Sequence, residues 1–146
     1  MNAFPTVEFD QGILTIEDVI AVACLSARPV LSMEPAFRDR IKRGADFLDA
    51  LLREDGVIYG VTTGYGDSCT VPVPLHLVSE LPHQLYTYHG CGLGQYLSAE
   101  ETRAVIAARL ASLCKGYSGV SVSLLEGIVR FLDEGILPLI PSEGSV

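Results

Sequence analysis

The sequence predicts a mainly α-helical fold with short extended segments near the N-terminus and two glycine-rich interruptions. Two observations lead to this fold class. Apolar residues recur at three- and four-residue steps over most of the chain, and helix-capping residues stand at the starts of several of these stretches. At 146 residues the chain has the length of one ordinary domain. We find no internal repeat and no linker that divides it.

The first fifteen residues predict two short extended pieces joined by a turn at Gly12. Thr15 is then placed to cap a helix, and Asp18 in the first turn favours the helix dipole. We expect this short amphipathic helix to end near residue 28, because Pro29 disfavours helical backbone in the residue before it.

A second, longer helix is expected from residue 33 to residue 53. Its apolar residues recur on one face, as in an amphipathic helix: Phe37, Ile41, Ala45, Leu48 and Leu52. After a glycine-rich segment, Pro72 and Pro74 suit the start of a further helix, and Pro82 suits a kink or a break in it.

The last two helices have the clearest boundaries. Ser98 and Glu101 form a capping box, and Gly116 stands where that helix should end. A final helix is expected from residue 121 to about residue 134, closed by a glycine. Prolines then force residues 136–146 into an extended conformation.

The charge of the chain argues against nucleic acid as a partner. The formal net charge is −8, and nucleic-acid binding needs a clustered basic face. Basic residues do gather at 38–43, but acidic neighbours on the same helix favour a solvated face.

No apolar run reaches the roughly 20 residues that span a bilayer, so we expect no membrane partner. The N-terminus carries acids where a signal peptide has bases, so we expect a cytoplasmic protein.

The cysteines and histidines form no metal-binding pattern. The four cysteines are widely spaced without a Cys-x-x-Cys pair, and we expect reduced thiols: Cys24, Cys69, Cys91 and Cys114. His76 and His83 are two helical turns apart, but Pro82 interrupts a common helix face. We therefore expect no metal.

Residues 56–70 predict a mobile loop with a function, because four glycines in thirteen residues exceed what a connector needs. This loop lacks the lysine of a phosphate-binding loop. A second glycine-rich run at residues 90–94 lacks a βαβ frame, so it is read as a turn with close packing. No nucleotide site is expected.

Three side chains are candidates for chemistry. Tyr59 opens the glycine-rich loop, and a phenol acts as a general base only where positive potential lowers its pKa from about 10. From the residues alone, a packed loop tyrosine is the more ordinary role. Tyr88 and His89 stand near a helix end, about 100° apart, where they can line a pocket wall. A histidine there is more often a partner of the helix dipole.

Taken in order, these segments resemble one family, the ammonia-lyases and aminomutases that act on histidine, phenylalanine or tyrosine. The resemblance begins with LTIEDVIAVA (14–23) and continues with VIYGVTTGYGDS (57–68) and LPHQLYTYHGCGLG (81–94). It then passes through residues 102–120 and ends with ILPLIPSEGSV (136–146). It implies the N-terminal helical part of an ammonia-lyase-type fold, with this chain as a single N-terminal region of a larger one.

The resemblance assigns roles to the candidate residues. Tyr59 matches the tyrosine that removes the substrate's β-proton, on a loop (56–70) that closes over the active site. The other residues of this active-site loop are Gly60, Gly64, Tyr65 and Gly66. Tyr88 and His89 match the pair that contacts the substrate ring, and His89 favours a ring with a polar edge, as in histidine or tyrosine.

Residues 136–146 match the lead-in to the family's electrophile. In the family, Gly-Ser-Val is followed by a glycine and an Ala-Ser-Gly tripeptide, which cyclises to 4-methylidene-imidazol-5-one and takes up the substrate amine. This tripeptide is expected beyond Val146, so residues 1–146 alone are expected to be inactive. Family enzymes are homotetramers with shared active sites, so the implied partners are the remainder of the lyase chain, further copies and an amino acid substrate.

The resemblance therefore implies an ammonia-lyase that converts an aromatic L-amino acid into an α,β-unsaturated acid, with Tyr59 as base. A 2,3-aminomutase on the same scaffold makes the same intermediate and stays open. A non-catalytic helical interaction module is the alternative from another class. The apolar extended segment at 136–140 argues against that module, because an independent domain rarely exposes such a run.

Overall fold

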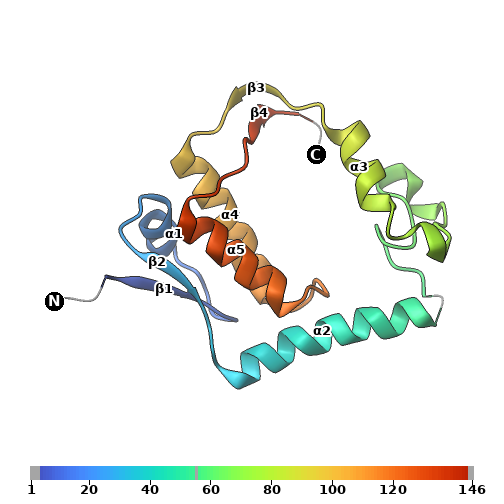
Figure 1. Ribbon diagram of the computed structural model, residues 1–146, viewed down its shortest axis with the longest axis horizontal. Helices are drawn as coiled ribbons and strands as arrows, with labels where there is room; N and C mark the ends of the chain where they lie inside the picture. Colours follow the sequence, from blue (N-terminus) through green and yellow to red (C-terminus); the bar gives the residue numbers. More distant parts are fainter. Residues whose placement is uncertain (1–3, 55, 145–146) are drawn as a thin grey trace.

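The computed structural model describes residues 4–54 and 56–144, and it confirms a mainly α-helical fold (Figure 1). Four short strands accompany the helices. The elements are β1 (Thr6–Phe9), α1 (Ile16–Ala23), β2 (Arg28–Leu31), α2 (Pro35–Arg53), α3 (Leu81–His89), β3 (Leu93–Tyr96), α4 (Ala99–Cys114), α5 (Val122–Glu134) and β4 (Pro141–Glu143), with 3₁₀ turns at Gly66–Thr70 and Leu75–Leu77.

The capping residues Thr15, Ser98 and Gly135 form the helix ends that local sequence predicts. Thr15 caps α1 and Ser98 caps α4, each hydroxyl accepting the N–H of the residue three positions later. In return, the carboxylates of Asp18 and Glu101 accept the backbone N–H of the capping residue. These backbone hydrogen bonds lower the pKa of both carboxyls. Gly135 ends α5 in the left-handed conformation, with φ of 69°.

The pairing of the strands was not predicted. β1 pairs with β2 in parallel, and β3 pairs with β4 antiparallel. Helix α1 therefore ends at Ala23, earlier than expected, because the chain must turn through Leu25 (φ 57°) to place β2 beside β1. The reading of residues 90–94 as turn and packing is wrong in part, since Leu93 begins a strand.

The helix expected after Pro72 and Pro74 forms later than predicted. Pro74 begins only the short 3₁₀ turn Leu75–Leu77, and α3 starts at Leu81. Pro82 lies in the first turn of α3, where the missing N–H of proline costs no helical hydrogen bond. The proline marks a break and a new start, not a kink within a long helix.

The hydrophobic core lies where the β1–β2 sheet meets α1, α4, α5 and the first half of α2 (Figure 1). Its buried residues are Val7, Phe9, Val22, Ala27, Phe37, Ile41, Ala107, Leu110, Leu113, Cys114, Leu125 and Leu132. Burial raises the pKa of the Cys114 thiol to about 11. None of the described residues between 56 and 98 belongs to this core.

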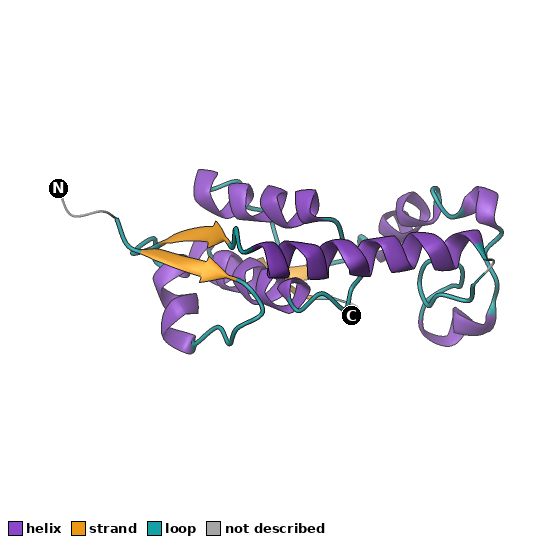
Figure 2. Cartoon of the chain, turned by 90° about the horizontal axis from the view of Figure 1, so that it is seen from below, coloured by secondary structure: helices purple, strands orange, loops and turns teal. Residues whose placement is uncertain are grey.

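Residues 56–80 and the start of α3 instead lie toward the far end of α2, away from the core, in both views (Figures 1 and 2). The direction of α2 is set by a close contact with the turn that follows α4. A Cβ on Gly44 would lie 2.9 Å from the carbonyl oxygen of Gly116, so this approach needs glycine. A Cβ on Gly119 would lie 3.0 Å from the Leu48 side chain.

The basic cluster of α2 is not simply a solvated face. Arg38 forms an ion pair with Glu126 of α5 at 2.9 Å. Arg40 Nε donates to the carbonyl oxygen of Lys115 at 2.9 Å, and its guanidinium lies 4.9 Å from the ring centroid of Tyr117. Both arginines therefore hold α2 against other elements, which local charge pairing does not reveal.

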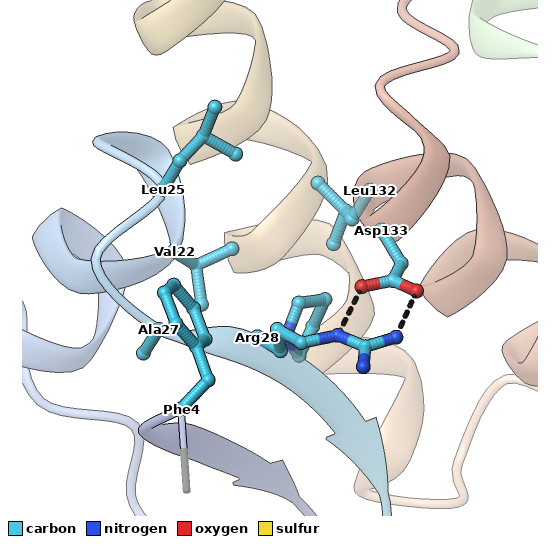
Figure 3. A pocket seen from close by; sticks show the side chains of 8 residues that line it. Phe4, Val22, Leu25, Ala27, Arg28, Leu132 and Asp133 are labelled. Atoms are coloured by element: carbon cyan, nitrogen blue, oxygen red, sulfur yellow. Dashed lines mark hydrogen bonds and ion pairs between the residues drawn. The ribbon is translucent and has the colours of Figure 1, made fainter. Parts of the chain in front are cut away.

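A forked ion pair ties β2 to the end of α5 (Figure 3). Arg28 Nε and Nη2 donate to the two carboxylate oxygens of Asp133 at 2.8 and 2.5 Å. The hydrogen bonds raise the pKa of Arg28 and lower that of Asp133. The pair borders a hollow of about 260 Å³, whose apolar walls include Phe4, Val22 and Leu132.

We predict that Leu110→Ala lowers the free energy of unfolding by about 3 kcal/mol, because a fully buried side chain leaves a cavity. Leu124→Ala is the matched control, since Leu124 is 47% exposed. It should cost less than about 1 kcal/mol. Urea unfolding followed by circular dichroism measures both, and equal losses would contradict this account of the core.

The Arg28–Asp133 pair should make stability depend on pH. Since the pKa of Asp133 lies below its ordinary value of 3.8, the ionised pair stabilises the fold above that pH. This contribution is lost as the pH falls through the folded-state pKa. Asp133→Asn should therefore be less stable than the parent at pH 7, with a difference that shrinks toward pH 2. Thermal melts across this range provide the measurement, and a constant difference would contradict the prediction.

Candidate active site

Thr62 organises the start of the glycine-rich loop from a buried position. Its hydroxyl accepts the N–H of Ile58 at 2.8 Å and donates to the carbonyl oxygen of Gly56 at 2.9 Å. Its own carbonyl accepts the N–H of Val73 at 2.8 Å. One side chain thus closes the turn before Tyr59 and joins it to the segment after the loop.

Thr63, which is also buried, closes the next turn of the loop with its hydroxyl. Its hydroxyl accepts the N–H of Gly60 at 3.1 Å and donates to the carbonyl oxygen of Gly64 at 2.9 Å. An isolated antiparallel bridge pairs Thr63 with Pro72, and the N–H of Gly64 donates to Val71 at 3.1 Å. The two threonines satisfy backbone groups that the glycines alone would leave without partners.

Tyr59 is held at its phenol oxygen, which accepts the backbone N–H of Gly66 at 3.0 Å. The ring of Tyr65 meets the ring of Tyr59 edge to face, with centroids 6.2 Å apart and an interplanar angle of 85°. The Tyr59 side chain is 64% exposed. The hydrogen bond from Gly66 and the edge-to-face contact with Tyr65 together fix the position of the phenol.

Gly60 is required by the geometry beside the phenol. Its φ is +70°, and a Cβ at this position would lie 2.7 Å from Cε1 of Tyr65. A Cβ added at Gly64 would lie equally close, 2.7 Å, to Cβ of Ser68. Gly66 has φ of +56°, and a Cβ added there would meet no atom within 4 Å. The structure thus brings the predicted loop residues together around Tyr59. The mobility of the loop stays a prediction.

Tyr59 also lines a groove of about 600 Å³ between α2, the loop and the turn at 116–119. Phe47, Leu48 and Leu51 of α2 give this groove an apolar wall. Arg40 and Arg43 line it as well. These arginines were not predicted as site residues, and only their helical spacing relative to Leu48 and Leu51 signals a shared face.

The other candidate residues receive less support from the geometry. Tyr88 and His89 end α3, but their side chains lie outside the described residues, so their contact with a substrate ring stays a prediction. Cys24, Cys69 and Cys91 are exposed free thiols. Within residues 4–54 and 56–144, no cluster of three or more His, Cys, Asp or Glu side chains is arranged to hold a metal ion. No helix in this described part is long and apolar enough to cross a membrane.

The helical fold and the glycine-rich tyrosine loop define a class of protein, the aromatic amino acid lyases. Residues 14–146 match the model of this family, described as aromatic amino acid lyase. The chain belongs to this family, and the prediction of an ammonia-lyase-type fold is confirmed.

Individual relatives and solved structures resemble this chain over most of its length. Histidine ammonia-lyase of Symbiobacterium thermophilum is 38% identical over 133 residues, covering 91% of this chain and 26% of the relative. Human histidine ammonia-lyase is 31% identical over 140 residues, covering 96% of this chain and 21% of the relative. The crystal structure of a tyrosine aminomutase from Streptomyces globisporus has a TM-score of 0.88 at 34% identity, covering 96% of this chain and 26% of that chain. The chain therefore spans about a quarter of the relatives it matches.

We predict that Gly60→Ala destabilises the loop, because alanine resists the positive φ and its Cβ meets the Tyr65 ring. The loss of unfolding free energy should exceed about 1 kcal/mol. The amide of Gly66 should also exchange with solvent faster, as its bond to Tyr59 is disturbed. Hydrogen exchange by NMR reports this change.

Gly127→Ala is the control for this substitution. Gly127 lies inside α5 with nothing within 4 Å of the added Cβ, so alanine should stabilise the helix by about 0.5–1 kcal/mol. If both substitutions had the same effect, the special role of Gly60 would be refuted.

Proposed function

We propose that this chain supplies the general base of an ammonia-lyase acting on an aromatic L-amino acid, and that Tyr59 is this base. The observation that carries the proposal is the 3.0 Å hydrogen bond from the Gly66 N–H to the Tyr59 phenol oxygen. Membership of the aromatic amino acid lyase family supports the reaction class. The groove that Tyr59 lines, with an apolar wall on α2 and Arg40 and Arg43 at its side, offers space for a substrate beside the phenol.

The proposed step is a proton abstraction at the substrate's β-carbon. The Tyr59 phenolate forms an O–H bond to the β-proton, the electrons of the C–H bond form the new double bond, and the C–N bond breaks with its electron pair leaving on the departing amine nitrogen. The products are an α,β-unsaturated acid and ammonia. Because the β-proton is weakly acidic, the step depends on an activated amine and on a base held in place.

The 4-methylidene-imidazol-5-one group would supply the activation of the amine. It would form from an Ala-Ser-Gly tripeptide beyond Val146, and none of the residues in this chain is its precursor. The chain's own contribution is therefore the base and the loop that holds it. Thr62 and Thr63 fix the backbone on either side of the phenol, and the exposed Tyr59 ring leaves room for a substrate.

Histidine and tyrosine are the favoured substrates in this proposal. The curated relatives from Symbiobacterium thermophilum and Streptococcus gordonii are histidine ammonia-lyases. By family resemblance we also propose that His89 contacts the substrate ring, and a histidine there suits an imidazole or a phenol. We further propose that this chain acts as the N-terminal region of a longer cytoplasmic lyase that assembles as a homotetramer.

A 2,3-aminomutase is the second candidate. Solved structures with this overall fold include a tyrosine aminomutase and the phenylalanine aminomutase of Pantoea agglomerans, which has a TM-score of 0.85 at 26% identity. Both activities use the same β-proton abstraction, so Tyr59 serves either one. Chromatography of the products distinguishes them, since only an aminomutase releases a β-amino acid.

We predict that Tyr59→Phe in the complete enzyme lowers turnover of histidine or tyrosine by at least about 10²-fold, because the proton acceptor is lost. The unfolding midpoint should change little, since the ring and its contact with Tyr65 remain. The appearance of the unsaturated acid is followed by ultraviolet absorbance.

Tyr96→Phe is the matched control, since Tyr96 is exposed on β3, outside the loop and groove. This variant should retain parent turnover. Retained activity in Tyr59→Phe would remove the base assignment. If the unchanged complete enzyme lacks turnover with any aromatic amino acid, the non-catalytic module becomes the better reading.

A further inference from the structure

The hydroxyl of Thr63 joins the two backbone segments that meet at the Tyr59 phenol. It accepts the N–H of Gly60, the residue directly after Tyr59, at 3.1 Å. It also donates to the carbonyl oxygen of Gly64 at 2.9 Å. Gly66, two residues further on, donates its N–H to the phenol oxygen at 3.0 Å. One hydroxyl therefore connects the backbone that carries the phenol to the backbone that binds it. We call its two hydrogen bonds the Thr63 clamp.

The backbone of this short segment has little rigidity of its own. Gly60 and Gly66 have φ of +70° and +56°, and a Cβ added at Gly66 would meet no atom within 4 Å. A glycine without close neighbours rotates readily between alternative backbone conformations. The direction of the Gly66 N–H toward the phenol therefore depends on the hydrogen bonds that hold residues 60 and 64.

The Thr63 clamp is buried, whereas the group that it holds is exposed. Thr63 is 4% exposed and Tyr59 is 64% exposed. Water does not readily replace the buried hydroxyl, so its loss would leave backbone groups without partners. The clamp is also anchored to the segment after the loop. Thr63 forms an antiparallel bridge with Pro72, and the Gly64 N–H donates to the carbonyl oxygen of Val71 at 3.1 Å.

The neighbouring Thr62 makes the same kind of hydrogen bonds in a different place. Its hydroxyl contacts the backbone of Ile58 and Gly56, which both precede Tyr59. Thr62 therefore holds the approach to the phenol and does not link Tyr59 to the segment that binds its oxygen. This difference assigns the link across the phenol to Thr63.

We propose that Thr63 is a positioning residue for the general base, and that its hydroxyl sets where the Tyr59 phenol lies relative to the β-carbon of the substrate. Thr63 acts through the backbone of Gly60 and Gly64 and not by contact with the substrate. The proposal rests on the proposed function, because it takes the phenol as the base. Proton abstraction depends on the placement of the base, and a displacement of about 1 Å can lower the rate about 10²-fold.

Substitutions at Thr63 in the complete enzyme test the proposal. Thr63→Val removes the hydroxyl at nearly constant volume. It should lower kcat by about 10- to 100-fold with little change in KM, because the base is displaced while substrate binding is kept. Thr63→Ser keeps the hydroxyl and should keep most of the parent kcat. Thr6→Val is the matched control and should retain parent turnover, since Thr6 is exposed on β1, outside the loop and groove.

A double substitution shows whether Thr63 acts through the phenol. Once Tyr59→Phe has removed the base, adding Thr63→Val should lower turnover no further, because no base is left to position. A loss of the same factor in both backgrounds would show that Thr63 supports the site only in a general structural way, and it would overturn the proposal. Parent turnover in Thr63→Val would overturn it too, as would an equal loss in Thr63→Ser.

Hydrogen exchange separates this proposal from the base assignment. In Thr63→Val the Gly66 amide should exchange faster than in the parent, and mass spectrometry with electron-transfer fragmentation assigns the exchange to single residues. Unchanged exchange would refute the Thr63 clamp, whereas retained turnover in Tyr59→Phe would refute the base assignment. If Thr63→Val does not fold, Thr63→Cys takes its place, because a thiol of similar size forms only weak hydrogen bonds. The same directions of change are expected.

Discussion

The close contact between α2 and the turn after α4 is the constraint on which the placement of the site depends. The first half of α2 belongs to the core through Phe37 and Ile41, which are almost fully buried. At Gly44 the helix passes the Gly116 carbonyl at a distance that excludes a larger residue. Beyond that point α2 leaves the core, and the segment that contains Tyr59 follows its far end (Figure 1). Its angle therefore determines where the phenol lies.

The conformation of the candidate site is defined mainly by hydrogen bonds, because it adds no residue to the buried apolar core. Thr62 and Thr63 use their hydroxyls both as donors and as acceptors, which closes two turns around Tyr59. The phenol oxygen is then fixed by the N–H of Gly66. Glycine at position 60 removes the atom that would collide with the Tyr65 ring. Backbone freedom in the sequence thus becomes a defined conformation, because each glycine is held by a polar partner.

Features encoded by neighbouring residues could be predicted from the sequence, and features that need distant partners could not. The caps at Thr15 and Ser98 depend on residues three positions away, so the pattern is sufficient. The loop around Tyr59 was found through its glycines and through family resemblance. The β1–β2 pairing joins segments more than twenty residues apart, and Arg40 contacts Lys115 across the fold. Such contacts leave no periodic trace in the chain.

The separation of the Tyr59 region from the core has a consequence for dynamics. The described residues between 56 and 98 contribute nothing to the buried cluster, so opening them exposes little apolar surface. Local opening of such a region requires less free energy than global unfolding. The described residues thus combine two levels of cooperativity, a core that unfolds as a unit and a segment around Tyr59 that can open while the core stays native. Contacts from the rest of a lyase would act first on the second level, by raising the free energy of local opening.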